Sequence, residues 1–251
     1  MAGGTASSDT NRPGAMTGRW SLLLGLAAPL AGVAGALAAS RELVAAIVGF
    51  SFFLLSVPLA GLGLVLGWVG LLRSRSGRNP SARRRALAGS IFSVLTLSAV
   101  GGLALPSVPY PFINDVTTDL GDPPKFVKCT ELAPNRGRDM SYPVAFAAEQ
   151  RKGYPNLVGQ VLPIEPVFAV ERAVAALESI PGTTIVDVDP EAGRIEAINM
   201  TRVFRFVDDI VVRVRPDAGG SKVDMRSKSR DGKGDLGANA ARIEGFMLAL
   251  R

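Results

Sequence analysis

The sequence predicts three transmembrane α-helices followed by an extracytoplasmic α+β domain, in which two helices cover one face of a four-stranded antiparallel sheet in two layers. Three observations predict this fold class. The first 105 residues hold three long uncharged apolar runs, and an arginine-rich link joins the second run to the third. After residue 166 a helical repeat is followed by two hairpin patterns and a second helical repeat.

The apolar runs cover residues 21–39, 43–72 and 86–105, inside a predicted membrane region of residues 20–106. About 20 apolar residues are enough to cross a bilayer, so each run predicts one transmembrane helix and the lipid bilayer is the first expected partner. Pro58 lies near the middle of the longest run, where we expect a kink or a tilt.

The orientation follows from the loop predicted at residues 73–85, which carries six arginines and no acid. Basic loops remain in the cytoplasm. Residues 1–19 are then a disordered cytoplasmic tail, and residues 107–251 lie outside the inner (plasma) membrane. An alternative is that Ala36-Leu37-Ala38 ends a cleaved signal peptide, which leaves the folded domain on the same side.

Composition excludes several functional classes. The chain has a net charge of +6, but residues 107–251 contain 19 basic and 20 acidic residues, so we expect no nucleic-acid partner. The absence of histidine excludes Ser-His-Asp and Cys-His catalysis and histidine-based zinc sites. The single cysteine, Cys129, cannot form an intrachain disulfide. We therefore expect no cofactor and no metal, and we expect the protein not to be an enzyme.

The exported domain is predicted to begin with an irregular arm over residues 107–165, which is rich in proline and turn-forming residues. Three acidic residues in this arm, Asp115, Asp119 and Asp122, suggest a calcium loop, although turn chemistry explains them equally well. A helix then begins at Pro166 and ends before Pro181-Gly182.

Two hairpins and a final helix complete the predicted domain. The first hairpin pairs Thr184–Val188 with Ile195–Thr201, and the second pairs Ile210–Arg215 with Lys222–Ser229. The last helix is predicted from Asp235, as its N-cap, to Leu250.

Strand alternation in the second hairpin assigns each side chain to a face. It predicts pairs of Val212 with Met225 on the inner face and of Arg213 with Asp224 on the outer face. The outer residues Arg226 and Lys228 are expected on a solvated, charge-matched surface, with Lys228 opposite Asp209.

A polar cluster is predicted where the last strand meets the last helix. Its side chains share the inner edge of the sheet or one side of the helix, and they are Asp208, Ser227, Ser229, Asp235, Asn239 and Arg242. One interpretation is a hydrogen-bonded network that fixes the helix to the sheet. The other is a small-ligand site, in which hydroxyls, an arginine and helix N–H groups hold an anion.

Four stretches of the exported domain resemble the bacterial family known as domain of unknown function 1499. They are INDVTTDLGDPPKF, Tyr154-Pro155, DDIVVRVRP and VDMRSKSRDGKGDLGANAARI, and the resemblance covers about residues 112–250. It implies a domain that is often fused to membrane helices, and it transfers no activity and no catalytic residue.

Three functions remain open on the sequence alone. The favoured one is a cell-envelope protein whose exported domain interacts with other membrane or envelope proteins or binds a ligand. The second is a hydrolase or transferase that acts on an envelope lipid or polymer through the polar cluster. The third is an accessory subunit of a membrane transporter.

Overall fold

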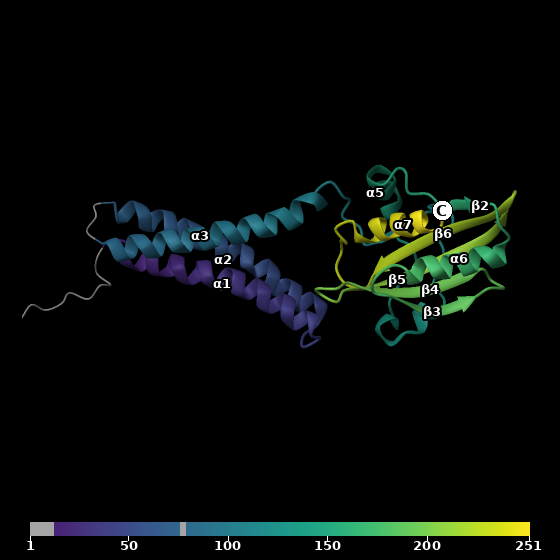
Figure 1. The fold of residues 1–251 in the computed structure, drawn as a ribbon, viewed down its shortest axis with the longest axis horizontal. Helices are drawn as coiled ribbons and strands as arrows, with labels where there is room; N and C mark the ends of the chain where they lie inside the picture. Colours follow the sequence, from purple (N-terminus) through teal and green to yellow (C-terminus); the bar gives the residue numbers. More distant parts are fainter. Residues whose placement is uncertain (1–12, 76–78) are drawn as a thin grey trace, which may run out of the picture. The chain divides into compact units, whose positions relative to one another are not determined.

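The computed structural model describes residues 13–75 and 79–251 (Figure 1). The chain divides into two compact units, Met1–Pro106 and Ser107–Arg251. The first contains long helices, and the second contains a twisted antiparallel sheet with helices against it. Three long apolar helices followed by an α+β domain confirm the coarse fold prediction.

The helical unit consists of α1 (Ala15–Ser40), α2 (Ala46–Arg73) and α3 (Pro80–Ala104), followed by the 3-10 turn η2 (Leu105–Ser107). Each long helix has the length and apolar composition needed to cross a membrane. Glycines allow the helices to approach closely, since a Cβ atom added at Gly25 would lie 2.5 Å from the carbonyl oxygen of Gly89. Small residues at helix contacts are typical of membrane bundles.

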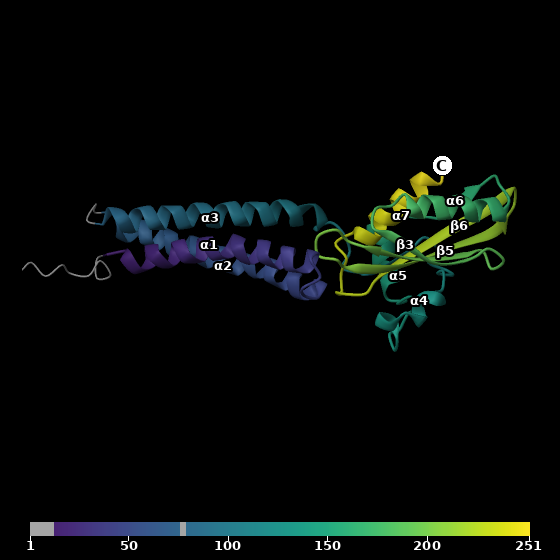
Figure 2. The ribbon, with the colours of Figure 1, turned by 60° about the horizontal axis from the view of Figure 1, so that its bottom comes forward.

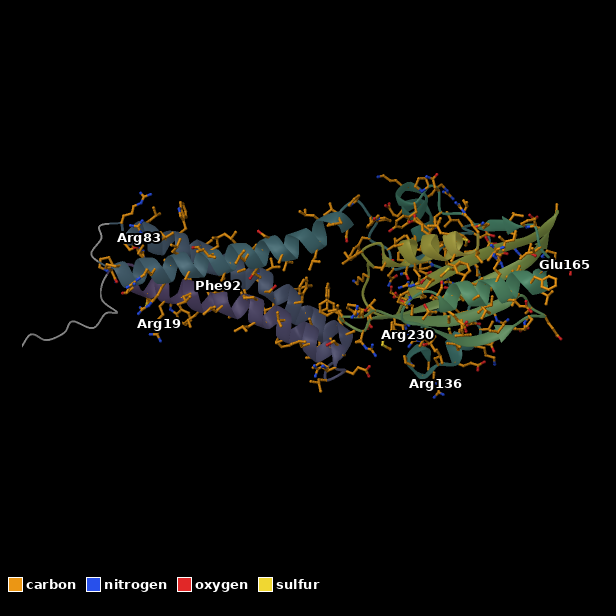
Figure 3. All side chains as sticks on the ribbon, in the orientation of Figure 1. Arg19, Arg83, Phe92, Arg136, Glu165 and Arg230 are labelled. Atoms are coloured by element: carbon orange, nitrogen blue, oxygen red, sulfur yellow. The ribbon has the colours of Figure 1, made fainter. Side chains whose placement is uncertain are left out.

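The helix ends differ from those predicted. The helix α1 begins inside the predicted tail of residues 1–19, of which residues 1–12 lie outside the described part. The predicted loop of residues 73–85 is shorter, because Asn79 caps α3 by accepting a hydrogen bond from the Ala82 N–H at 3.1 Å. Arg83 therefore lies on α3, and it projects near the same end of the helical unit as Arg19 (Figure 3).

The sheet of the second unit has six strands and not the predicted four. Its strands are β1 (Asp115–Thr117), β2 (Gln160–Leu162), β3 (Thr183–Asp189), β4 (Arg194–Met200), β5 (Val207–Asp217) and β6 (Gly220–Ser229). The order is β1-β6-β5-β4-β3, and β2 also pairs with β6. The two additional strands come from the predicted irregular arm, and they cover the outer edge of β6 at its two ends.

The predicted register of the β5–β6 hairpin is confirmed. Val212 pairs with Met225, and Arg213 pairs with Asp224. Asp217 and Gly220 also pair, so both strands extend beyond the predicted ends at Arg215 and Lys222, and two residues form the turn. Because side chains alternate along a strand, this register also fixes which residues of β6 face the helices.

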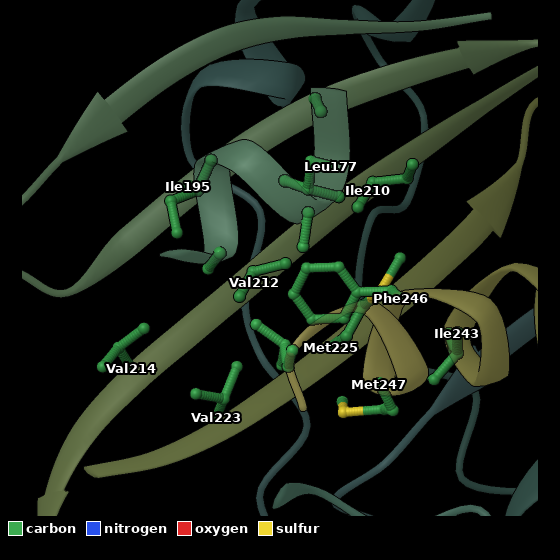
Figure 4. Packing of buried hydrophobic residues seen from close by; sticks show 14 of the residues in the cluster. Leu177, Ile195, Ile210, Val212, Val214, Val223, Met225, Ile243, Phe246 and Met247 are labelled. Carbon is green, nitrogen blue, oxygen red and sulfur yellow. The ribbon is translucent and has the colours of Figure 1, made fainter. Parts of the chain in front are cut away.

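Helices α6 (Pro166–Glu178) and α7 (Ala238–Ala249) both lie on the inner face of the sheet, as predicted. The main hydrophobic core forms between them and the strands (Figure 4). Leu177, Ile210 and Phe246 are fully buried there. Burial of such side chains contributes roughly 1.5–3 kcal/mol each, so this core is a main source of the stability of the unit.

The outer face is also covered, which corrects the prediction of a two-layer domain. Figure 2 shows α4 (Lys128–Glu131) on the side of the sheet opposite α6 and α7. The arm of residues 107–165, to which α4 belongs, also contains η3 (Ala133–Asn135) and α5 (Phe146–Gly153). A second, smaller core forms where this arm meets the outer face of the sheet, and it contains Phe126, Cys129, Met140 and Val211.

Candidate functional site

The structure brings the predicted polar cluster together at the junction of β6 and α7. Arg242 is its centre. Its Nη2 atom donates to Asp208 Oδ2 at 2.6 Å and to Asn199 Oδ1 at 3.1 Å. Its Nη1 atom donates to Ser227 Oγ at 2.9 Å and to Asn239 Oδ1 at 2.8 Å. A single guanidinium therefore joins three strands, β4, β5 and β6, to the last helix.

Asn239 completes the network through both ends of its amide. Its Oδ1 atom accepts from Ser227 Oγ at 2.6 Å, and its Nδ2 atom donates to Ser229 Oγ at 3.0 Å. Asn239 and Ser227 are fully buried. Buried amides and hydroxyls are stable only when they are hydrogen-bonded, and here each finds its partner inside the cluster.

Asp235 lies just before the helix and is not its N-cap as predicted, because Gly237 occupies that position with a left-handed backbone (φ 85°). The Asp235 carboxylate instead accepts from the N–H groups of Gly237 at 3.0 Å and Asn239 at 2.9 Å. Burial raises the pKa of Asp235, these hydrogen bonds oppose the rise, and the nearby Asp208 adds to it. Asp235 therefore satisfies helix N–H groups from outside the helix.

The cluster is closed. In the described part of the chain, none of its six side chains has a buried polar atom without a hydrogen-bond partner. The groove beside α6 and the cavity beside α7 are lined by other residues. This geometry favours the network interpretation, because an anion bound here would have to displace hydrogen bonds that already exist.

A second polar layer, which sequence reasoning missed, lies on the outer face of the sheet. Arg226 was predicted to face solvent, but it is only 1% exposed. Its Nε and Nη2 atoms donate to the two carboxylate oxygens of Asp115 at 2.8 and 2.7 Å. Its guanidinium also lies 4.8 Å from the ring centre of Phe126. The arm that carries Asp115 and Phe126 therefore covers this arginine.

Lys228 is likewise buried, against prediction. It lies opposite Asp209 in the register, as predicted, but its Nζ donates to Asp115 Oδ2 at 2.9 Å. Asp209 instead accepts from Arg230 Nη2 at 2.7 Å. Ser227 and Lys228 point to opposite faces of β6, so the arrangement does not form a Ser–Lys catalytic pair.

Glu196 is the other buried carboxylate that organises the arm. One oxygen accepts from the N–H groups of Val127 and Lys128, both at 2.9 Å, and the other accepts from Cys129 N–H at 2.7 Å. The sheet thus supplies the acceptor for the first N–H groups of α4, which has no cap of its own. The sequence contained one indication that the outer face is covered. The apolar Val211 alternates onto this face.

The three arm carboxylates considered for calcium contact basic side chains instead. Asp115 binds Arg226, and Asp119 and Asp122 bind Arg213 at 3.1 and 2.9 Å. Over residues 13–75 and 79–251, no group of three or more acidic, histidine or cysteine side chains is arranged to hold a metal ion.

Cys129 is fully buried beneath the arm. Burial, followed by the charges of Asp209 and Glu196, raises the pKa of its thiol far above the usual value. A thiol of this kind stays protonated at neutral pH and is a poor nucleophile.

Two cavities open on the surface of the second unit. One is an apolar groove of about 400 Å³ between α6 and the neighbouring end of β3, with Val167 and Val188 among its lining residues. The other has a volume of about 230 Å³ and lies beside α7, with Tyr154 in its wall. The Tyr154 hydroxyl oxygen is buried and has no hydrogen-bond partner within the described residues.

These features define a chain with three candidate membrane spans and an antiparallel α+β domain whose buried charges are paired. The family model described as "Protein of unknown function (DUF1499)" matches residues 115–250, more than half of the chain. The chain belongs to this family. No curated protein and no solved structure matches the chain.

Proposed function

We propose that the protein is a membrane-anchored binding protein of the cell envelope, whose second unit is presented outside the inner membrane. The anchor consists of α1, α2 and α3, each long and apolar enough to span a bilayer. The orientation is supported by the six arginines between residues 73 and 85, because basic segments stay in the cytoplasm.

The engagement of the polar side chains in structural contacts favours a binding function over a catalytic one. The predicted cluster is fully engaged in holding α7 to the sheet, as the contacts of Arg242 and Asn239 illustrate. The buried carboxylates of the outer face, Asp115 and Glu196, are engaged in holding the arm. A general acid or base must reach a substrate proton, and these groups are committed to other partners.

The orientation is tested by fusing topology reporters to the full chain at Arg251 and, as a matched control, after Arg75. A reporter that is active only outside the cytoplasm is expected to work at residue 251 and to be silent at residue 75. A reporter that is active only in the cytoplasm is expected to give the opposite pattern. Activity of the cytoplasmic reporter at residue 251 would overturn the proposed orientation.

A further inference from the structure

The cavity beside α7 is assembled from three separate segments of the second unit. Tyr110 comes from the chain before β1, Tyr154 and Asn156 follow α5, and Gly237 and Glu244 belong to the start and the outer side of α7. Its volume of about 230 Å³ equals that of about eight water molecules at ~30 Å³ each. The space is suited to a small polar group.

Two glycines allow the aromatic wall to form. A Cβ atom at Gly237 would lie 2.5 Å from the ring of Tyr110, and the positive φ of 85° at Gly237 also favours glycine. A Cβ atom at Gly153 would lie 2.6 Å from Pro111. The rings of Tyr110 and Tyr154 are thereby held with their centres 5.9 Å apart.

Tyr154 lines this space, and its buried hydroxyl is unsatisfied. The residue is 8% exposed, and its Oη atom has no partner among the described residues. Buried polar groups in native proteins are rarely left without a partner, and such exceptions mark places where a ligand or water completes the bonding. Burial raises the pKa of Tyr154, so its hydroxyl stays protonated and can both donate and accept.

The charge of the cavity is negative. Among the described residues, Glu244 is the one charged residue of its lining, and no lysine or arginine contributes to the wall. Asp235 adds a second negative charge nearby, since it contributes with Glu244 to the raised pKa of Tyr154. A cation is attracted both to such carboxylates and to the faces of aromatic rings.

We propose that this cavity binds a small organic ammonium group, which rests against the rings of Tyr110 and Tyr154 and is neutralised by Glu244. The inference rests on the proposed binding function and gives its ligand class. The same ammonium chemistry is present in a free amine and in the ethanolamine headgroup of a lipid.

The test uses the purified full chain in detergent and ethanolamine as the probe, observed by saturation-transfer NMR. Ethylene glycol is the neutral control, because a hydroxyl replaces the ammonium group. We expect ethanolamine to bind and ethylene glycol not to bind. Tyr110→Leu, which removes one ring of the wall, and Glu244→Gln are each expected to weaken ethanolamine binding at least tenfold, whereas Glu178→Gln, an exposed change on α6, leaves it unchanged.

Equal binding of the two probes, or unchanged binding by Tyr110→Leu with an unchanged Tm, would overturn the proposal. Nanodiscs then separate the two sources. If the natural ligand is a headgroup, phosphatidylethanolamine nanodiscs suppress ethanolamine binding and phosphatidylglycerol nanodiscs do not. If it is a free amine, both nanodiscs bind ethanolamine alike. Neither measurement depends on membrane orientation, so the reporter fusions can fail while this proposal holds.

Discussion

At the residue scale, three buried charges of the second unit form a compact group of one carboxylate and two cations. Asp115 is fully buried, and it contacts both Arg226 and Lys228. The remaining donors of Arg226 reach the carbonyl oxygens of Pro124 at 3.2 Å and Met140 at 2.9 Å. Such a group is stable only as a whole, because removal of one partner leaves an uncompensated buried charge.

Asp115→Asn is therefore expected to lower the free energy of unfolding by about 3–5 kcal/mol, since two buried cations lose their shared anion. Chemical denaturation of the full chain in detergent, followed by circular dichroism, measures the change. Asp139→Asn is the control, because Asp139 is an exposed residue of the same arm, and little change is expected there. Equal effects of the two substitutions would show that the Asp115 group does not stabilise the fold.

The cluster at α7 predicts an energetic coupling between two of its side chains. Asp208 and Arg242 are joined at 2.6 Å and are nearly buried, with side-chain exposures of 4% and 6%. In a double-mutant cycle with Asp208→Ala and Arg242→Ala, the double substitution should cost less than the sum of the singles, by roughly 0.5–3 kcal/mol.

The matched control for that cycle is the exposed pair of Lys128 and Glu131, whose side chains are 45% and 62% exposed. Its coupling is expected to be about 0.3–0.5 kcal/mol, because solvent screens exposed ion pairs. If Asp208 and Arg242 gave no more coupling than this pair, the closed network would have no structural role.

The sequence correctly predicted the sheet face of single side chains where strand alternation determines it. Alternation correctly directs Ser227 toward α7 and Arg226 away from it. It could not show that the outer face is covered, because alternation identifies a face and not what lies above it. The error at Arg226 and Lys228 has this single cause.

At the scale of the element, the arm is held to the sheet by Glu196, whose carboxylate takes the place of a helix cap. Glu196→Gln is expected to release α4, because a neutral amide offers one acceptor oxygen and the carboxylate offers two. We expect hydrogen exchange at the amides of Val127, Lys128 and Cys129 to become about tenfold faster or more, since hydrogen bonds to charged groups contribute roughly 1.5–3 kcal/mol.

Glu165→Gln is the control for this experiment. Glu165 stands at the N-cap position of α6 but makes no side-chain capping hydrogen bond. Exchange near the start of α6 should therefore be unchanged. If the amides of α4 also exchanged at the wild-type rate in Glu196→Gln, the arm would be held mainly by other contacts, such as those of its small apolar core.

The elements predicted from the sequence were those long enough to show a repeat. The helix α6 has apolar residues at helical spacing, and charged and uncharged residues alternate along β6 from Lys222 to Lys228. Strands β1 and β2 have three residues each, which is too short to display a period of two. They form because β6 offers an open edge, and an edge strand pairs readily with any extended segment nearby.

At the scale of the whole molecule, charge divides along the same boundary as structure. Residues 1–106 carry nine arginines and two acidic residues, whereas residues 107–251 are close to neutral. The boundary between the two compact units also falls after Pro106. The basic residues of the first unit lie beside its candidate membrane spans, as the proposed membrane anchor predicts.

Labelling of single cysteines tests the orientation, which is the central claim, most directly. Cys129 is fully buried, so the wild-type chain provides an unlabelled background for a membrane-impermeant maleimide. Val144 is 85% exposed in the second unit, and Arg75 lies in the link between α2 and α3. We predict that Val144→Cys is labelled while the inner membrane is intact and that Arg75→Cys is labelled only after permeabilisation. Labelling of Arg75→Cys alone in intact cells would contradict the proposed orientation.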